Sequence, residues 1–290
     1  MTHDDTVPWQ VIDDVGPLVR ATHRRDFPVT DAIIDTYRRD GVVHVPGAFV
    51  EWVDPLRAGL DRNMASPAGY AFPSENLSAD EPGRFFESYC NWQRIGEYLA
   101  FVLSSGAASL AARLMESPSA QFFHDHAFSK EGGTAKATPW HQDLPYYCVD
   151  GTRTASVYVS LDDAPAETAI RFVRGSHRWG DTFAPRRFVD GHDYPTDGPS
   201  LPTVPDIDDD SRDVISGRLE PGDAVVFDFR TLHGSTAAPV ERRRRAFSTR
   251  WLGEDVVYCE RPSPTSPPLT DLETAPGAHL PEDRFPILWP

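Results

Sequence analysis

Two residues with metal-binding side chains, His141 and Asp143, are separated by a single residue in the middle of the chain. In an extended segment successive side chains alternate between faces, so His141 and Asp143 point the same way and Gln142 points the other way. One imidazole nitrogen and one carboxylate oxygen can then reach the same ion. His-x-Asp is a common tripeptide and a weak indication alone, but a second histidine would complete the facial triad of non-haem iron(II) oxygenases.

A candidate for that second histidine is His233, which follows an apolar run over residues 224–229. Gly222 and Asp223 form a turn signal before this run, and Gly234 lets the backbone bend after it. Arg244 comes eleven residues after His233 and opens another apolar strand pattern. A buried arginine offers a planar fork that matches a carboxylate, which a dicarboxylate cosubstrate would need.

The composition limits the classes of protein to which the chain can belong. It has 290 residues, 40% of them hydrophobic, which is enough for a substantial core. A net charge of −16 disfavours binding to nucleic acid and is compatible with a small-molecule substrate. The three cysteines are widely spaced, which argues against a disulfide framework or a zinc site and favours a reducing cytoplasm. No apolar run suggests membrane insertion, and the first residues lack a signal-peptide pattern.

The first part of the chain is predicted to be mostly helical. Residues 1–26 are polar and aperiodic and are expected to form an irregular arm. A helix is predicted over residues 31–40, capped by Thr30 and ended by Gly41, and a strand over residues 42–45 follows it. A second helix is predicted over residues 55–63, and two packed helices over residues 92–115 with a break near residues 104–106. Residues 27–116 would then form a helical layer.

The remainder of the chain has the pattern of an all-β core. The sequence predicts these strands: residues 121–129, 155–161, 170–173, 224–229 and 245–252. Short strands without intervening helices favour a barrel or sandwich. We therefore predict one domain, residues 1–290, in which a jelly-roll core (residues 117–256) packs against the helical layer. Residues 188–212 are expected to form a long loop, and the tail, residues 257–290, ends in an apolar segment that can dock on the body.

Four segments together resemble the phytanoyl-CoA hydroxylase-like family of iron(II)- and 2-oxoglutarate-dependent oxygenases, in particular its bacterial branch. They are residues 138–143, residues 171–180, residues 231–235 and Arg244, in the order and at the spacing of the family. Each motif alone is weak, whereas the four together are specific. The resemblance covers nearly the whole chain and implies a double-stranded β-helix, or jelly roll, flanked by helices, in agreement with the strand pattern.

The resemblance implies a role for particular residues. It implies that His141, Asp143 and His233 bind Fe(II). It also implies that the cosubstrate 2-oxoglutarate is held by these residues: Arg244, at its distal carboxylate, with Ser235, His126, Lys130 and Tyr158. With O2 as second cosubstrate, the enzyme would hydroxylate or otherwise oxidise an aliphatic carbon of a small molecule and release succinate and CO2.

Residues expected to contact the substrate are Gln142, Tyr146, Arg174 and Trp179. Arg174 departs from the family pattern, which has proline there, and an arginine suits an anionic group. Glu167 and Thr168 also replace the usual Asn-Gly pair. A halogenase of related fold would have Ala or Gly in place of Asp143, so the carboxylate favours hydroxylation.

Two other functions remain open from the sequence. One is a metal-dependent jelly-roll isomerase or lyase that uses the same three ligands without 2-oxoglutarate, against which Arg244 and Ser235 count. The other is a non-catalytic binding module, against which the intact triad counts. The chain is expected to be a monomer or homodimer, and the substrate itself cannot be read from the sequence.

Overall fold

The computed structural model describes residues 25–70, 73–76, 83–134, 136–187, 192–196, 198–207, 212–237 and 241–290. The predicted N-terminal arm lies outside these residues except for Arg25 and Asp26, which have no regular structure.

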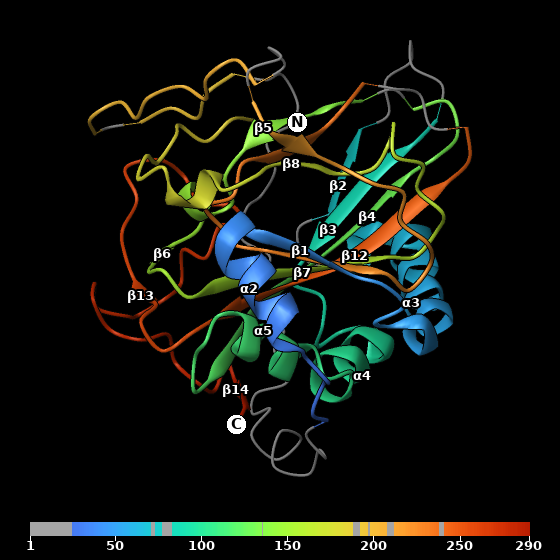
Figure 1. Ribbon diagram of the computed structural model, residues 1–290, viewed down its shortest axis with the longest axis horizontal. Helices are drawn as coiled ribbons and strands as arrows, with labels where there is room; N and C mark the ends of the chain where they lie inside the picture. Colours follow the sequence, from blue (N-terminus) through green and yellow to red (C-terminus); the bar gives the residue numbers. More distant parts are fainter. Residues whose placement is uncertain are drawn as a thin grey trace.

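Two antiparallel sheets form the core (Figure 1). The larger sheet has the order β1-β10-β7-β12-β4-β3-β2, with β14 also paired to β4. Its strands are β1 (Val42–Val45), β2 (Pro73–Asn76), β3 (Phe85–Tyr89), β4 (Ala120–Lys130), β7 (Thr154–Ser160), β10 (Ala224–Phe227), β12 (Arg244–Leu252) and β14 (Ile287–Trp289). The smaller sheet has the order β5-β11-β8-β9, with β5 (Thr138–His141), β8 (Arg171–Val173), β9 (Val214–Ile215) and β11 (His233–Ser235). A separate pair joins β6 (Val149–Asp150) to β13 (Val257–Tyr258).

A layer of helices covers one face of the larger sheet (Figure 1). The layer consists of α2 (Asp31–Asp40), α3 (Val53–Ala65), α4 (Gly96–Ser104) and α5 (Ala107–Leu114). Short 3₁₀ turns are η1 (Val50–Trp52), η2 (Pro67–Gly69), η3 (Leu144–Tyr146) and η4 (Ser176–Arg178). Among the described residues, no helix is long and apolar enough to cross a membrane.

Strand alternation divides the larger sheet into an apolar face and a functional face. Phe247 and Trp251 of β12 pack in the cluster formed with the helices. The intervening residues Ser248 and Arg250 therefore point to the other side, toward the smaller sheet. Apolar contacts between the two sheets include the rings of Phe172 and Phe227, whose centroids are 5.1 Å apart. The chemistry-bearing side chains thus lie between the two sheets, where water is largely excluded.

Most predicted elements are present within one or two residues. The helix over residues 31–40 has the predicted bounds, and Gly41 ends it in the left-handed conformation with φ of 75°. Thr30 stands at the N-cap position but makes no capping side-chain bond. The helix predicted over residues 55–63 extends to both sides as α3, and Gly106, with φ of 87°, separates α4 from α5. The five predicted core strands are β4, β7, β8, β10 and β12.

Two parts of the structure differ from or add to the sequence prediction. The hairpin β2–β3 was not predicted, and it extends the larger sheet beyond β4 within the region expected to be helical. One described residue of the predicted loop at residues 188–212, Asp193, forms an isolated bridge with Arg186, which precedes the loop. The C-terminal segment docks as predicted, since β14 pairs with β4 and Phe285 is 1% exposed.

Candidate metal centre

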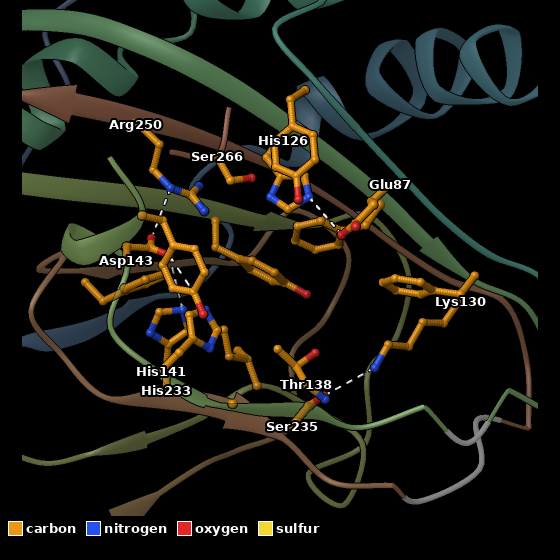
Figure 2. A pocket seen from close by; sticks show the side chains of 18 of the residues that line it. Glu87, His126, Lys130, Thr138, His141, Asp143, His233, Ser235, Arg250 and Ser266 are labelled. Atoms are coloured by element: carbon orange, nitrogen blue, oxygen red, sulfur yellow. Dashed lines mark hydrogen bonds and ion pairs between the residues drawn. The ribbon is translucent and has the colours of Figure 1, made fainter. Parts of the chain in front are cut away.

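Three side chains, from two neighbouring strands and the turn that follows one of them, converge on one point. The Nε2 atoms of His141 and His233 lie 3.7 and 3.6 Å from the same Asp143 oxygen, Oδ1. One ligand atom from each of the three residues lies within 4.8 Å of the others. Strands β5 and β11 pair with His141 opposite His233, so the backbone register itself brings the imidazoles together (Figure 2). Two nitrogens and one oxygen on one side of a point form a site that can hold a divalent metal ion.

Asp143 reaches the site by a route that differs from the expected one. Strand β5 ends at His141, and Asp143 has helical backbone angles, φ −72° and ψ −39°, at the start of η3. The prediction that alternation along one extended segment aligns the two ligands is therefore wrong, although the side chains do converge. The Asp143 and Leu144 N–H groups both donate to the Phe229 carbonyl, at 2.7 and 3.0 Å, and so fix this turn.

The two histidines are held in the same tautomer by the same local contact. His141 Nδ1 lies 2.8 Å from the Pro139 carbonyl, and His233 Nδ1 lies 2.9 Å from the Thr231 carbonyl. A carbonyl can only accept a hydrogen bond, so each Nδ1 carries the proton and each Nε2 presents a lone pair to the centre. Such a second contact is typical of histidines that bind metals. The donor set therefore fits a metal ion by its chemistry as well as by its distances.

The second oxygen of Asp143 is held by the protein. Ser156 Oγ donates to Asp143 Oδ2 at 2.9 Å. Arg250 Nε lies 3.1 Å from the same oxygen, an ion pair drawn in Figure 2. Arg250 also donates to the Tyr147 hydroxyl at 2.9 Å and to Ser248 Oγ. These contacts leave Oδ1 as the oxygen that faces the histidines.

Burial and charge set the protonation states of the triad. Burial, and then the neighbouring His233, lower the pKa of His141 to about 3, and burial also lowers the pKa of His233. Burial alone would raise the pKa of Asp143, but Arg250 and the two imidazoles hold it below its ordinary value. Near neutral pH the site therefore offers two neutral imidazoles and one carboxylate, the protonation states in which they bind metal.

A cavity opens beside the triad, and one end of it is basic. Arg244 and Lys130 are opposite each other on β12 and β4, and both line the cavity. Lys130 Nζ donates to the Lys136 carbonyl at 2.7 Å and to Ser235 Oγ at 3.2 Å. Burial, and then Arg244 and Lys136, lower the pKa of Lys130 to about 7. Among the described residues Arg244 has no ion pair with a carboxylate, although it is only 9% exposed. Two adjacent buried cations that lack a carboxylate partner in the described part of the chain can together hold a bound carboxylate.

The wall formed by β3, β4 and β7 adds polar groups to the cavity. The Tyr158 hydroxyl and the His126 Nε2 are buried and lack a hydrogen-bond partner among the described residues. His126 Nε2 lies 3.5 Å from Glu87 Oε2, too far for a good hydrogen bond (Figure 2). Such groups can be satisfied by a bound molecule.

The residues expected to contact the substrate divide into two groups. Tyr146 lines the cavity, with its ring edge-on to His141 at 5.7 Å between centroids. The other three do not line it. Gln142 is 2% exposed and donates to the carbonyls of Asp181 and Arg230.

Arg174 and Trp179 also have structural partners away from the cavity. Arg174 pairs with Asp40 at 2.7 Å and with Asp213 at 2.9 Å. The Trp179 ring packs edge-on to Phe183 and lies under the guanidinium of Arg212. The expectation that Gln142, Arg174 and Trp179 bind substrate is therefore not supported by their positions.

Several cavity residues were not singled out from the sequence. Arg244 and Arg250 are an even number of positions apart on β12, so the alternation of side chains along the strand places both on the same face. That signal was present in the sequence. Glu87 and Tyr89 belong to β3, which was not recognised as a strand, and therefore gave no usable pattern.

Comparison with known proteins gives one family. The sequence profile of the family described as phytanoyl-CoA dioxygenase (PhyH) matches residues 37–246. No protein with a curated description matches the sequence significantly.

Several solved structures have the same fold. The non-heme alpha-ketoglutarate-dependent carbocyclase SnoK from nogalamycin biosynthesis is 22% identical with a TM-score of 0.70, over 89% of this chain and 96% of that chain. The epimerase SnoN, in complex with Fe3+, alpha-ketoglutarate and nogalamycin RO, is 23% identical with a TM-score of 0.68, over 89% and 98%. EctD from S. alaskensis, with 2-oxoglutarate and 5-hydroxyectoine, is 17% identical with a TM-score of 0.59, over 83% and 82%. At these identities the likeness establishes the jelly-roll fold.

Proposed function

The chain belongs to the phytanoyl-CoA dioxygenase family, and on this premise we propose that it is an Fe(II)- and 2-oxoglutarate-dependent oxygenase acting on a small molecule. The proposal rests chiefly on the convergence of His141, Asp143 and His233, in which the Nδ1 protons of the two imidazoles are directed away from the centre. Two histidines and one carboxylate on one face are the donor set of non-haem Fe(II), and they leave coordination positions free. His141, Asp143 and His233 are therefore our proposed iron ligands.

When bound, Fe(II) would activate O2, with 2-oxoglutarate as the co-reductant: one oxygen atom would enter succinate as 2-oxoglutarate loses CO2, and the other would serve to oxidise an aliphatic carbon of the substrate. The remaining work of the chain is to bind, orient and shield the reactants. Arg250 and Ser156 keep Asp143 ionised and fix one of its oxygens, so that the other can face the metal. The sheets exclude water, which strengthens each of these charge interactions.

The basic end of the cavity is the proposed site for the distal carboxylate of 2-oxoglutarate. Arg244 can pair with it through two parallel N–H donors, and the Lys130 ammonium and the Ser235 hydroxyl lie beside it. Ser235 already accepts a hydrogen bond from the Thr138 N–H at 3.1 Å, which leaves its own proton free to donate. The unpartnered His126 and Tyr158 are proposed to contact the cosubstrate as well.

Hydroxylation is the proposed outcome at the substrate, and Asp143 supports it because a halogenase needs that coordination position free. The fold neighbours include a carbocyclase and an epimerase, so product analysis must decide between hydroxylation and another oxidation.

The proposal is tested by the turnover of 2-oxoglutarate without added substrate, which such enzymes carry out slowly. We expect iron-dependent formation of succinate by the wild type. The rate should fall at least about a hundredfold in His141→Ala, because one of three ligands is lost. His279→Ala, at an exposed histidine, is the matched control and should retain the rate. No succinate from the iron-loaded wild type, together with turnover of a substrate in the absence of 2-oxoglutarate, would favour an isomerase or lyase instead.

A further inference from the structure

Glu87 is a buried carboxylate in the cavity that neither the metal nor the cosubstrate proposal uses. It lies on β3 opposite Phe128 of β4 and is 9% exposed. Burying an ionised carboxylate is costly unless a positive charge accompanies it. Among the described residues, Glu87 has no ion pair with a lysine or an arginine. The group therefore requires a partner that the described part of the chain does not provide.

In the described part of the chain, one side chain lies within ion-pair distance of Glu87, that of His126, and it is a poor counter-charge. Its Nε2 lies 3.5 Å from Glu87 Oε2. Burial lowers the pKa of His126 despite the nearby carboxylate, so the imidazole is neutral near pH 7. The Tyr89 ring stacks on it with 4.0 Å between centroids, which holds the imidazole in place.

Lys130 lies on the same wall but turns its charge to the other end of the cavity. Its ammonium bonds to the Lys136 carbonyl and Ser235 Oγ, beside Arg244. In the register of β3 and β4, Lys130 is opposite Phe85, two positions before Glu87. At roughly 3.4 Å per residue, this separates the Glu87 pair from the Lys130 pair by about 7 Å along the wall. The cavity thus has a basic end suited to a dicarboxylate and a distinct anionic position further along.

We propose that Glu87 selects substrates that carry a protonated amine, binding the ammonium group as its counter-ion within the cavity. The inference rests on the proposed oxygenase function and adds the chemical class of the substrate. The aromatic side chain of Tyr89, beside Glu87 in the cavity lining, gives the ammonium group a favourable face. The net charge of −16 attracts cations to the molecule as a whole. A neutral or anionic substrate would leave Glu87 with no positively charged partner among the described residues.

The test uses anaerobic protein loaded with Fe(II) and saturating 2-oxoglutarate, so that the chelate is verified before any probe is added. The probes are two matched sets of equal skeleton: benzylamine, benzyl alcohol and benzoate, and cyclohexylmethylamine, cyclohexylmethanol and cyclohexanecarboxylate. Binding is measured from the broadening of probe resonances in ligand-observed NMR. We expect an ammonium member to bind at least about tenfold more tightly than its alcohol.

Glu87→Gln should abolish this preference, while the chelate and the melting temperature stay close to those of the wild type. Glu282→Gln changes the net charge equally at an exposed position and should leave the preference intact. The proposal is overturned if no amine binds, if the alcohols or carboxylates bind as well as the amines, or if the preference survives in Glu87→Gln. Failure of the chelate to form would instead contradict the oxygenase function.

Discussion

The carbonyls of Pro139 and Thr231 decide which nitrogens of His141 and His233 face the centre. Each histidine bonds to a carbonyl two residues earlier in the chain, so the tautomer is set by local backbone. Because burial also keeps both imidazoles neutral, a metal ion near neutral pH does not have to displace a proton from either.

Arg250 positions Asp143, the proposed acidic ligand of the metal. Its Nε lies 3.1 Å from Asp143 Oδ2, and its charge lowers the pKa of that carboxyl group. We expect Arg250→Met to weaken Fe(II) binding by about tenfold to a hundredfold and to shift the loss of metal on acidification to higher pH. Calorimetric titration with Fe(II) across pH 5–8 measures both effects. Arg243→Met, at an exposed position, is the control, and unaltered metal affinity in a folded Arg250→Met protein would contradict this role.

The pKa of Lys130 leads us to expect that 2-oxoglutarate binding depends on pH. With a pKa of about 7 in the free protein, Lys130 is protonated below pH 7 and progressively neutral above it. A bound carboxylate favours the ammonium form and raises that pKa, so binding takes up a proton above pH 7. The affinity for 2-oxoglutarate should therefore be constant below pH 7 and fall by up to about tenfold per pH unit above it.

Equilibrium titrations between pH 6 and 9 check this, with Lys130→Gln expected to flatten the decline. Lys136→Gln should keep the decline but move it to higher pH, because Lys136 lowers the pKa of Lys130. The same slope in wild type and Lys130→Gln would show that another group titrates.

At the scale of elements, the turn between α2 and β1 connects the helical layer to the sheets. Gly41 has φ of 75°, and a Cβ at this position would lie 2.2 Å from His177 Nδ1. Its carbonyl accepts from the Thr231 hydroxyl at 2.8 Å, two residues before His233. The glycine is thus required both by its backbone conformation and by the close approach of η4.

We expect Gly41→Ala to lower the free energy of unfolding by roughly 2–4 kcal/mol, from left-handed strain and steric overlap. Urea denaturation measures the change. Gly96→Ala is the matched control, because nothing lies within 4 Å of its Cβ and its backbone is helical; it should change the stability by less than about 1 kcal/mol. Equal stability of the two variants would refute the argument.

Helices and strands could be predicted well from the sequence where one face of the element is apolar. They could be predicted only poorly where contacts with distant residues determine the local structure. Strands such as β7 and β12 lie between the helical layer and the other sheet, and their apolar residues were recognisable locally. The short hairpin β2–β3 was missed because β3 carries a charged residue, Glu87, between two aromatic residues on its cavity face, and pairing with β4 stabilises it. Asp143 was predicted to converge with His141, but the turn that achieves this depends on hydrogen bonds to Phe229, eighty-six residues away.

At the scale of the whole molecule, the jelly roll brings residues far apart in the sequence to one cavity. His141, His233 and Arg244 were predictable because the residue types and their order match a family. Glu87 and Arg250 complete the charge pattern of the cavity. Arg250 could have been found from its even spacing to Arg244 on one strand, whereas Glu87 becomes evident only once the pairing of β3 with β4 is known. The cavity combines the candidate metal centre, a basic end with Arg244 and Lys130, and one buried carboxylate, that of Glu87, on its wall.

The central claim, that these parts bind Fe(II) and 2-oxoglutarate together, is tested most directly by an anaerobic titration. Iron-loaded protein is titrated with 2-oxoglutarate while the weak visible charge-transfer band of the chelate is followed. We predict that the band appears in wild type and that Arg244→Ala needs at least about tenfold more 2-oxoglutarate, because it loses a bidentate pair. Arg242→Ala, an exposed neighbour, should behave as the wild type. Absence of the band in wild type despite bound iron would contradict the account.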